Sequence, residues 1–122
     1  MDKNTSADKL SVILWLLQRV TAILIFLVLG LHIFKVHYAD IGQPILFSGI
    51  VLRLKRVFTF GLDISLLFLV LFHGLNGLRS VLIDFNFFSK YEKIVSLILL
   101  LIGVVFAIWG LRGLWAFILI RS

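Results

Sequence analysis

The chain has 122 residues, of which 61% are hydrophobic, and its mean hydropathy is +1.14. These values exclude an ordinary soluble domain, whose apolar share is about 45–50%. The formal net charge of +6 at pH 7 is typical of a membrane protein whose Lys and Arg side chains meet lipid headgroups, and we favour this over nucleic-acid binding. The chain has no cysteine, so any redox role must rest on histidine.

Three apolar runs fill most of the chain, and each is long enough to cross a bilayer. We expect membrane spans at about residues 10–34, 57–83 and 94–120, in one all-α transmembrane domain with no soluble catalytic domain. The first run is too long for a signal-peptide core and lacks a small-residue cleavage site, so we expect it to remain as a span.

The segments outside these spans are short. Residues 42–56 are expected to form an interfacial connector with a short amphipathic helix, in which Pro44 suits the first turn. Residues 84–93 are expected to form a polar turn. The Lys and Arg residues divide six against six between the two sides, so the positive-inside rule does not orient the chain. In the third span Ser96, Gly103, Ala107 and Gly110 form a stripe of small residues, which we interpret as a helix-packing surface.

His73 is the strongest candidate for a functional residue, because it lies near the centre of the second span. Ionisable side chains at that depth are costly and mark functional sites by default. Gly74 and Gly77 follow it, so a flat ligand such as haem could approach the helix closely. Asp84 lies eleven residues further on, about three turns along nearly the same helix face. The alternative is a neutral histidine hydrogen-bonded to a neighbouring helix.

His32 is a second candidate, on the opposite side of the membrane from His73. Centring the spans puts the two histidines at depths that differ by about 15–20 Å, at 1.5 Å per residue. One haem iron cannot be bound by both, so they would serve two haems, each completed by a histidine from elsewhere. The alternative for His32 is an interfacial, solvated side chain. His37 lies beyond the last apolar residue, and we interpret it as solvated.

Two further charged residues lie within the apolar runs. Arg19 costs less at its shallow position than the roughly 2.5–3.5 kcal/mol found at a helix centre. It could meet a haem propionate or the carboxylate of a partner subunit. Asp63 is the one acid well inside the second span, and the sequence suggests Arg56 or Lys35 as its partner without giving it a function.

The order of these features resembles the smaller, D-type membrane-anchor subunit of succinate dehydrogenase, or succinate:quinone oxidoreductase. Three passages carry the resemblance: Gln18-Arg19-Val20-Thr21-Ala22-Ile23, Val57-Phe58, and His73 with Asp84 followed by an aromatic residue. Together with the three-span layout they cover almost the full chain.

The resemblance implies roles for several residues. His73 matches the family's axial haem b ligand, His32 resembles the additional histidine of two-haem members, and Asp84 would lie near the quinone pocket. The family usually has Tyr after this acid, whereas the chain has Phe85, which cannot donate a hydrogen bond to a quinone carbonyl. The N-terminus and the Asp84 loop would face the dehydrogenase.

The resulting interpretation is a three-helix subunit that is not an enzyme alone and forms half of a haem-binding anchor bundle. The implied partners are a second anchor subunit, an iron–sulfur subunit, a flavoprotein subunit, lipid and quinone, and the implied cofactor is one or two haems b. The expected location is a prokaryotic cytoplasmic membrane rather than the mitochondrial inner membrane. The alternative is a cofactor-free membrane scaffold or assembly subunit, in which both histidines make interhelical hydrogen bonds.

Overall fold

The computed structural model of the chain describes residues 3–35 and 49–120, and the described part is helical apart from short connections. The helices are α1 (Lys3–Phe34), α2 (Gly49–Asp84), the single turn α3 (Asn86–Ser89) and α4 (Glu92–Ile120). Thr5–Phe34, Val57–Asp84 and Glu92–Ala116 are long and apolar enough to cross a membrane. The expected all-α architecture with three membrane-spanning helices is therefore confirmed.

The start of α2 differs from the expected separate connector. Residues 49–56 continue directly into the second span as its first turns, because no Gly or Pro interrupts the sequence between Gly49 and Val57. The rest of that connector, including Pro44, lies outside the described residues, as does His37.

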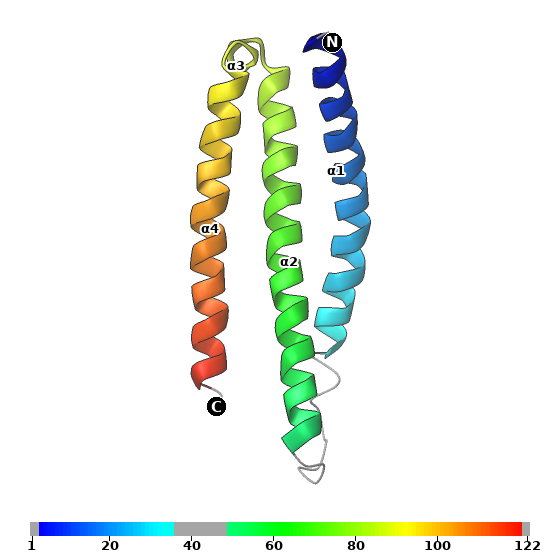
Figure 1. The fold of residues 1–122 in the computed structure, drawn as a ribbon, viewed down its shortest axis with the longest axis vertical. Helices are drawn as coiled ribbons and strands as arrows, with labels where there is room; N and C mark the ends of the chain where they lie inside the picture. The colour runs from blue at the N-terminus through cyan, green and yellow to red at the C-terminus, as the bar shows by residue number, and fades with distance from the viewer. Residues whose placement is uncertain (1–2, 36–48, 121–122) are drawn as a thin grey trace.

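The three long helices lie in a row, with α2 between α1 and α4 (Figure 1). α2 runs antiparallel to both neighbours, and α1 and α4 do not contact one another. The N-terminus and α3 therefore lie at the same end of the row. Large apolar side chains cover its outward surfaces, as Phe26 (77% exposed) and Trp109 (70% exposed) illustrate. Apolar surface all round a helix is typical of membrane spans.

Two glycines of α4 bring it close to α2. A Cβ added at Gly103 would lie 2.6 Å from Leu75 Cδ1, and one added at Gly110 would lie 2.8 Å from Leu67 Cδ1. Each glycine therefore makes room for a leucine of α2. This contact supports the interpretation of the stripe of small residues as a helix-packing surface.

A polar contact joins α2 to α4 near α3. Arg79 Nε donates to Ser96 Oγ at 2.7 Å, and its Nη2 donates to Glu92 Oε1 at 2.6 Å. Phe85 follows α2 in an extended conformation and precedes α3. The charged pair thus links α2 and α4 at the end of the row that carries α3.

Candidate functional site

Four polar side chains meet between α1 and α2, in the half of the row nearer α3. Gln18 and Thr21 come from α1, whereas His73 and Asn76 come from α2. Thr21 (7% exposed) and Asn76 (9% exposed) are the buried polar residues of the part of the chain that the structure describes. His73 is half-buried beside them.

The hydroxyl of Thr21 favours a proton on Nδ1 of His73. Thr21 Oγ1 donates its one hydrogen back to the Leu17 carbonyl at 2.7 Å, with the Gln18 carbonyl at 3.2 Å. The same oxygen lies 3.1 Å from His73 Nδ1 and, with its hydrogen on the Leu17 carbonyl, can accept from Nδ1–H. A neutral His73 then carries its free lone pair on Nε2.

The amide of Gln18 completes the cluster. Its Nε2 donates to the His73 carbonyl at 3.1 Å and lies 3.4 Å from His73 Nε2, while its Oε1 accepts from Asn76 Nδ2 at 2.8 Å. The contact with the imidazole is longer than an ordinary N–H hydrogen bond. The Gln18 amide is therefore a weak donor to the lone pair of His73 Nε2.

The two glycines after His73 differ in their surroundings. A Cβ added at Gly77 would lie 3.0 Å from Gln18 Nε2, so this glycine makes room for the Gln18 side chain rather than for a ligand. A Cβ added at Gly74 would meet nothing within 4 Å. The surface open to a flat group beside His73 is therefore the one at Gly74.

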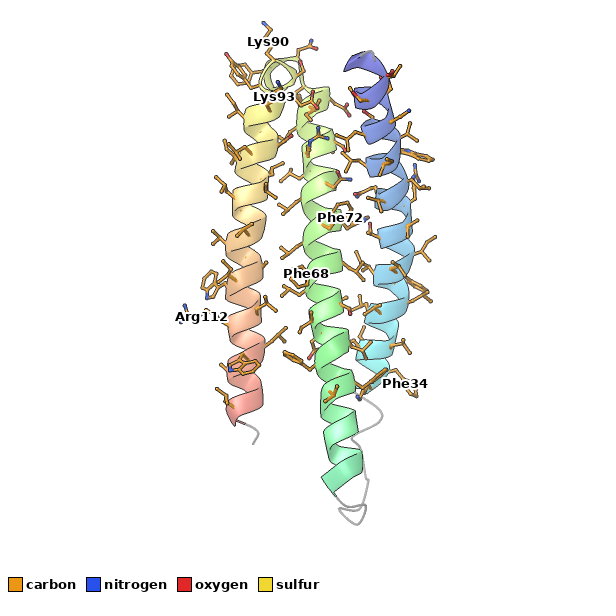
Figure 2. The ribbon with its side chains drawn as sticks, in the orientation of Figure 1. Phe34, Phe68, Phe72, Lys90, Lys93 and Arg112 are labelled. Carbon is orange, nitrogen blue, oxygen red and sulfur yellow. The ribbon has the colours of Figure 1, made fainter. Side chains whose placement is uncertain are left out.

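Asp84 is the last residue of α2, and it is exposed. The unbroken helix places it about 16 Å along the axis from His73, at 1.5 Å per residue. Phe85 is 59% exposed next to it. Lys90 and Lys93 lie at this same end, whereas Arg112 lies on the outer side of α4 (Figure 2).

His32 lies at the other end of the α1–α2 interface and contacts Asp63 of α2, with Nδ1 2.8 Å from Oδ1. From the sequence we expected Arg56 or Lys35 as the partner of Asp63, and the contact with His32 was not predicted. Lys35 Nζ lies over the Phe58 ring, 4.6 Å from its centroid, and the side chain of Arg56 lies outside the described residues.

The two histidines lie at different depths. His32 is eleven residues along α1 from Thr21, the partner of His73, which corresponds to about 16 Å at 1.5 Å per residue. This separation agrees with the expectation from the sequence. The structure thus brings each histidine to a different polar partner and does not bring the two together.

Arg19 lies outside both contacts. It is exposed on α1, and its Cζ lies 5.3 Å from the centroid of the Trp15 ring. Arg19 lies near the middle of the span Thr5–Phe34, where a charge is costly, and the cation–π contact with Trp15 offsets part of that cost. Its proposed meeting with an anion of a cofactor or a partner stays a prediction.

Comparison with known proteins adds the family context. Residues 2–112 match the family model described as "Succinate dehydrogenase/Fumarate reductase transmembrane subunit". The chain is 27% identical over 94 residues to the succinate dehydrogenase hydrophobic membrane anchor subunit of Thermoplasma acidophilum, covering 76% of each chain. It is 26% identical over 116 residues to the subunit of the same name from Archaeoglobus fulgidus, covering 95% of this chain and 98% of that one.

A bacterial relative is also similar. The succinate dehydrogenase 2 membrane subunit SdhC of Mycobacterium tuberculosis is 30% identical over 92 residues, covering 75% of this chain and 65% of the relative. No solved structure matches the chain significantly.

Proposed function

The chain belongs to the family of succinate dehydrogenase/fumarate reductase transmembrane subunits, and from this premise we propose that it is a cytochrome b anchor in which His73 is an axial ligand of haem b. It is an integral membrane subunit of an oxidoreductase complex rather than an enzyme alone. Electrons from succinate would reach quinone through the partner subunits and this membrane domain.

The contact between Thr21 and His73 carries the proposal. Iron is bound by a nitrogen lone pair, and the ring orientation of a ligating histidine is ordinarily fixed by a hydrogen bond from its other nitrogen. In the Nδ1–H tautomer Thr21 Oγ1 accepts from Nδ1–H, and Nε2 would be the ligating atom. The Gln18 amide, which also contacts the His73 carbonyl and Asn76, would have to move away from Nε2. Haem b, when bound, supplies a one-electron carrier in an apolar setting.

The arrangement of the row supports the proposed partners. A single row of helices leaves its broad surfaces free for a second anchor subunit, which would supply the other axial ligand. The iron–sulfur and flavoprotein subunits would dock at the end that carries the N-terminus and α3. Exposed aromatic side chains gather at that end, namely Phe85, Phe87 and Tyr91. Asp84 lies there as well and would help to shape the quinone site.

Further roles are proposed for His32 and Arg19. His32 would ligate a second haem on the side away from the dehydrogenase, because its depth excludes the iron bound by His73. Arg19 would contact a haem propionate or a carboxylate of a partner subunit. The archaeal and bacterial relatives support a prokaryotic cytoplasmic membrane as the location.

The test is a reduced-minus-oxidised absorbance spectrum of the purified complex, for the natural chain and for His73→Leu. We expect the natural complex to show a low-spin b-type signal, and the variant to lose it or convert it to high spin. His37→Leu is the matched control and should keep the signal. Unchanged haem content and spectrum in His73→Leu would refute the ligand role.

A second candidate function is a cofactor-free scaffold. The observation that favours it is that each described histidine contacts a side chain of the neighbouring helix, His73 with Thr21 and His32 with Asp63. In that case the purified complex has no b-type signal, and His73→Leu lowers only its thermal stability. The same spectrum therefore decides between the two candidates.

A further inference from the structure

The contact between His32 and Asp63 is the ionisable pair between α1 and α2 in the part of the chain that the structure describes. His32 lies near the end of the span Thr5–Phe34, and Asp63 lies about two turns into the span Val57–Asp84; their side chains are 29% and 21% exposed. Placing an acid in an apolar span is costly, so Asp63 calls for a partner or a function. The family resemblance assigns no role to Asp63.

One nitrogen of His32 and one oxygen of Asp63 each need the other as a hydrogen-bond partner. His32 Nδ1 and Asp63 Oδ1 are fully buried, and neither has a hydrogen bond of regular geometry among the described residues. They lie 2.8 Å apart, which is the separation of a hydrogen bond. A small rotation of the imidazole about its Cβ–Cγ bond would align Nδ1–H with the carboxylate. His32 Nε2 is not among these buried atoms.

We propose that Asp63 is a positioning residue, which holds His32 in the Nδ1–H tautomer and thereby directs Nε2 toward the iron of the haem on the side away from the dehydrogenase. This inference rests on the proposed function, specifically on His32 as a haem ligand. A carboxylate that accepts from the second nitrogen of a ligating histidine fixes the ring and raises the basicity of the ligating nitrogen.

The two histidines then differ in the group that accepts from Nδ1–H, and this difference affects the reduction potential of the haem that each one would bind. His73 donates to the hydroxyl of Thr21, a neutral acceptor, whereas His32 donates to a carboxylate. A more basic imidazole stabilises ferric iron over ferrous iron and lowers the reduction potential. Asp63 therefore lowers the potential of the haem bound by His32 and leaves the haem bound by His73 unchanged.

The experiment compares Asp63→Asn, Asp63→Leu and His32→Leu in the purified complex. Haem content, the low-spin electron paramagnetic resonance spectrum and the midpoint potential of each haem are measured. Asp8→Asn, which changes an exposed acid of α1, is the control. Asn keeps an oxygen that accepts from Nδ1–H but has no charge, whereas Leu removes the acceptor.

The expected results separate the two variants of Asp63. Asp63→Asn should keep both haems and raise the potential of one haem only. Asp63→Leu should shift the largest g value of that same haem and lower its occupancy. His32→Leu should remove that haem, and Asp8→Asn should change nothing. If Asp63→Leu prevents assembly, the potential measured in Asp63→Asn decides the question.

Two results would overturn the inference, and they differ in whether the ligand role of His32 fails with it. If His32→Leu removes one haem but both potentials in Asp63→Asn equal those of the natural complex, Asp63 does not position His32 and the proposed ligands stand. If His32→Leu removes no haem, the inference and the ligand role of His32 both fail. The role of His73 is tested independently by His73→Leu.

Discussion

Thr21 and His73 face each other across the α1–α2 interface, with Oγ1 of the threonine 3.1 Å from Nδ1 of the imidazole. The threonine hydrogen is already donated to the Leu17 carbonyl, so the contact has one direction, from histidine to threonine. A residue of α1 thus favours one tautomer of a residue of α2. This gives the buried threonine a role besides helix packing.

Replacing Thr21 with Val should leave the shape of the side chain almost unchanged and remove the acceptor for Nδ1–H. Interhelical hydrogen bonds in membranes contribute about 0.6–2 kcal/mol, so we expect a modest fall in the thermal midpoint of the complex. The larger effect should be on the haem signal of His73, because its ring loses the group that orients it. Thr21→Ser keeps the hydroxyl and should retain both properties. Equal spectra for the Val and Ser variants would contradict the tautomer argument.

The contact between α2 and α4 predicts opposite effects for two neighbouring glycines. A Cβ at Gly110 would lie 2.8 and 2.9 Å from the two methyl groups of Leu67, whereas one at Gly113 would meet nothing within 4 Å. Gly113→Ala should therefore stabilise α4 by about 0.5–1 kcal/mol through the lower entropy of the unfolded chain. Gly110→Ala should instead destabilise it by about 1–3 kcal/mol through overpacking.

Thermal denaturation of the purified complex, followed by circular dichroism, checks this pair. The midpoint should rise slightly for Gly113→Ala and fall for Gly110→Ala. A rise in both variants would mean that Leu67 moves away at no cost.

Of the two α4 side chains that contact Arg79, Ser96 should contribute more to thermal stability than Glu92. The Glu92 side chain is 53% exposed, and exposed ion pairs contribute about 0.2–1 kcal/mol. The Ser96 hydroxyl accepts from Arg79 Nε in a half-buried setting, where a donor left without a partner is costlier. We therefore expect Ser96→Ala to lower the thermal midpoint more than Glu92→Gln does. The opposite order would show that the charge pair dominates this contact.

Much of the architecture was predictable from hydropathy, because an apolar run of some twenty residues has few alternatives to a membrane-spanning helix. The start of the second helix was not predicted. The helix of α2 begins at Gly49 rather than near Val57, since hydropathy marks the membrane boundary and not the helix boundary. Local residues such as Arg53 and Lys55 end the apolar run without ending the helix.

The interhelical partners were not predicted, although the sequence holds a signal for them. Between Gln18 and His32 the chain advances fourteen residues along α1, and between Asn76 and Asp63 it returns thirteen along α2. In an antiparallel pair this nearly equal spacing allows both polar contacts to form in one register. Treating each span alone left Asp63 without its partner. Only side chains from both helices, taken together, identify the cluster.

Asp84 provides a test of the quinone site that does not depend on the haem ligands. It ends α2 about 16 Å from His73, at the end of the row proposed to face the dehydrogenase. Phe85 beside it has no hydroxyl, so we expect Asp84 to act on the quinone pocket or on its proton supply indirectly. Asp84→Asn should therefore lower quinone reduction, while succinate oxidation by a soluble artificial acceptor stays at the natural rate.

Phe85→Tyr is the companion variant in this experiment. If the exposed ring at position 85 lines the pocket, adding a hydroxyl that can donate to a quinone carbonyl should lower the KM for quinone several-fold with little change in kcat, because one neutral hydrogen bond contributes about 0.5–1.5 kcal/mol. Both variants are assayed in the same purified complex with quinone and with the soluble acceptor. If Asp84→Asn keeps the natural rate of quinone reduction, Asp84 is only a solvating group at the end of α2. If the rate falls with both acceptors, Asp84→Asn instead impairs assembly with the dehydrogenase, because the defect then lies before electrons reach the membrane.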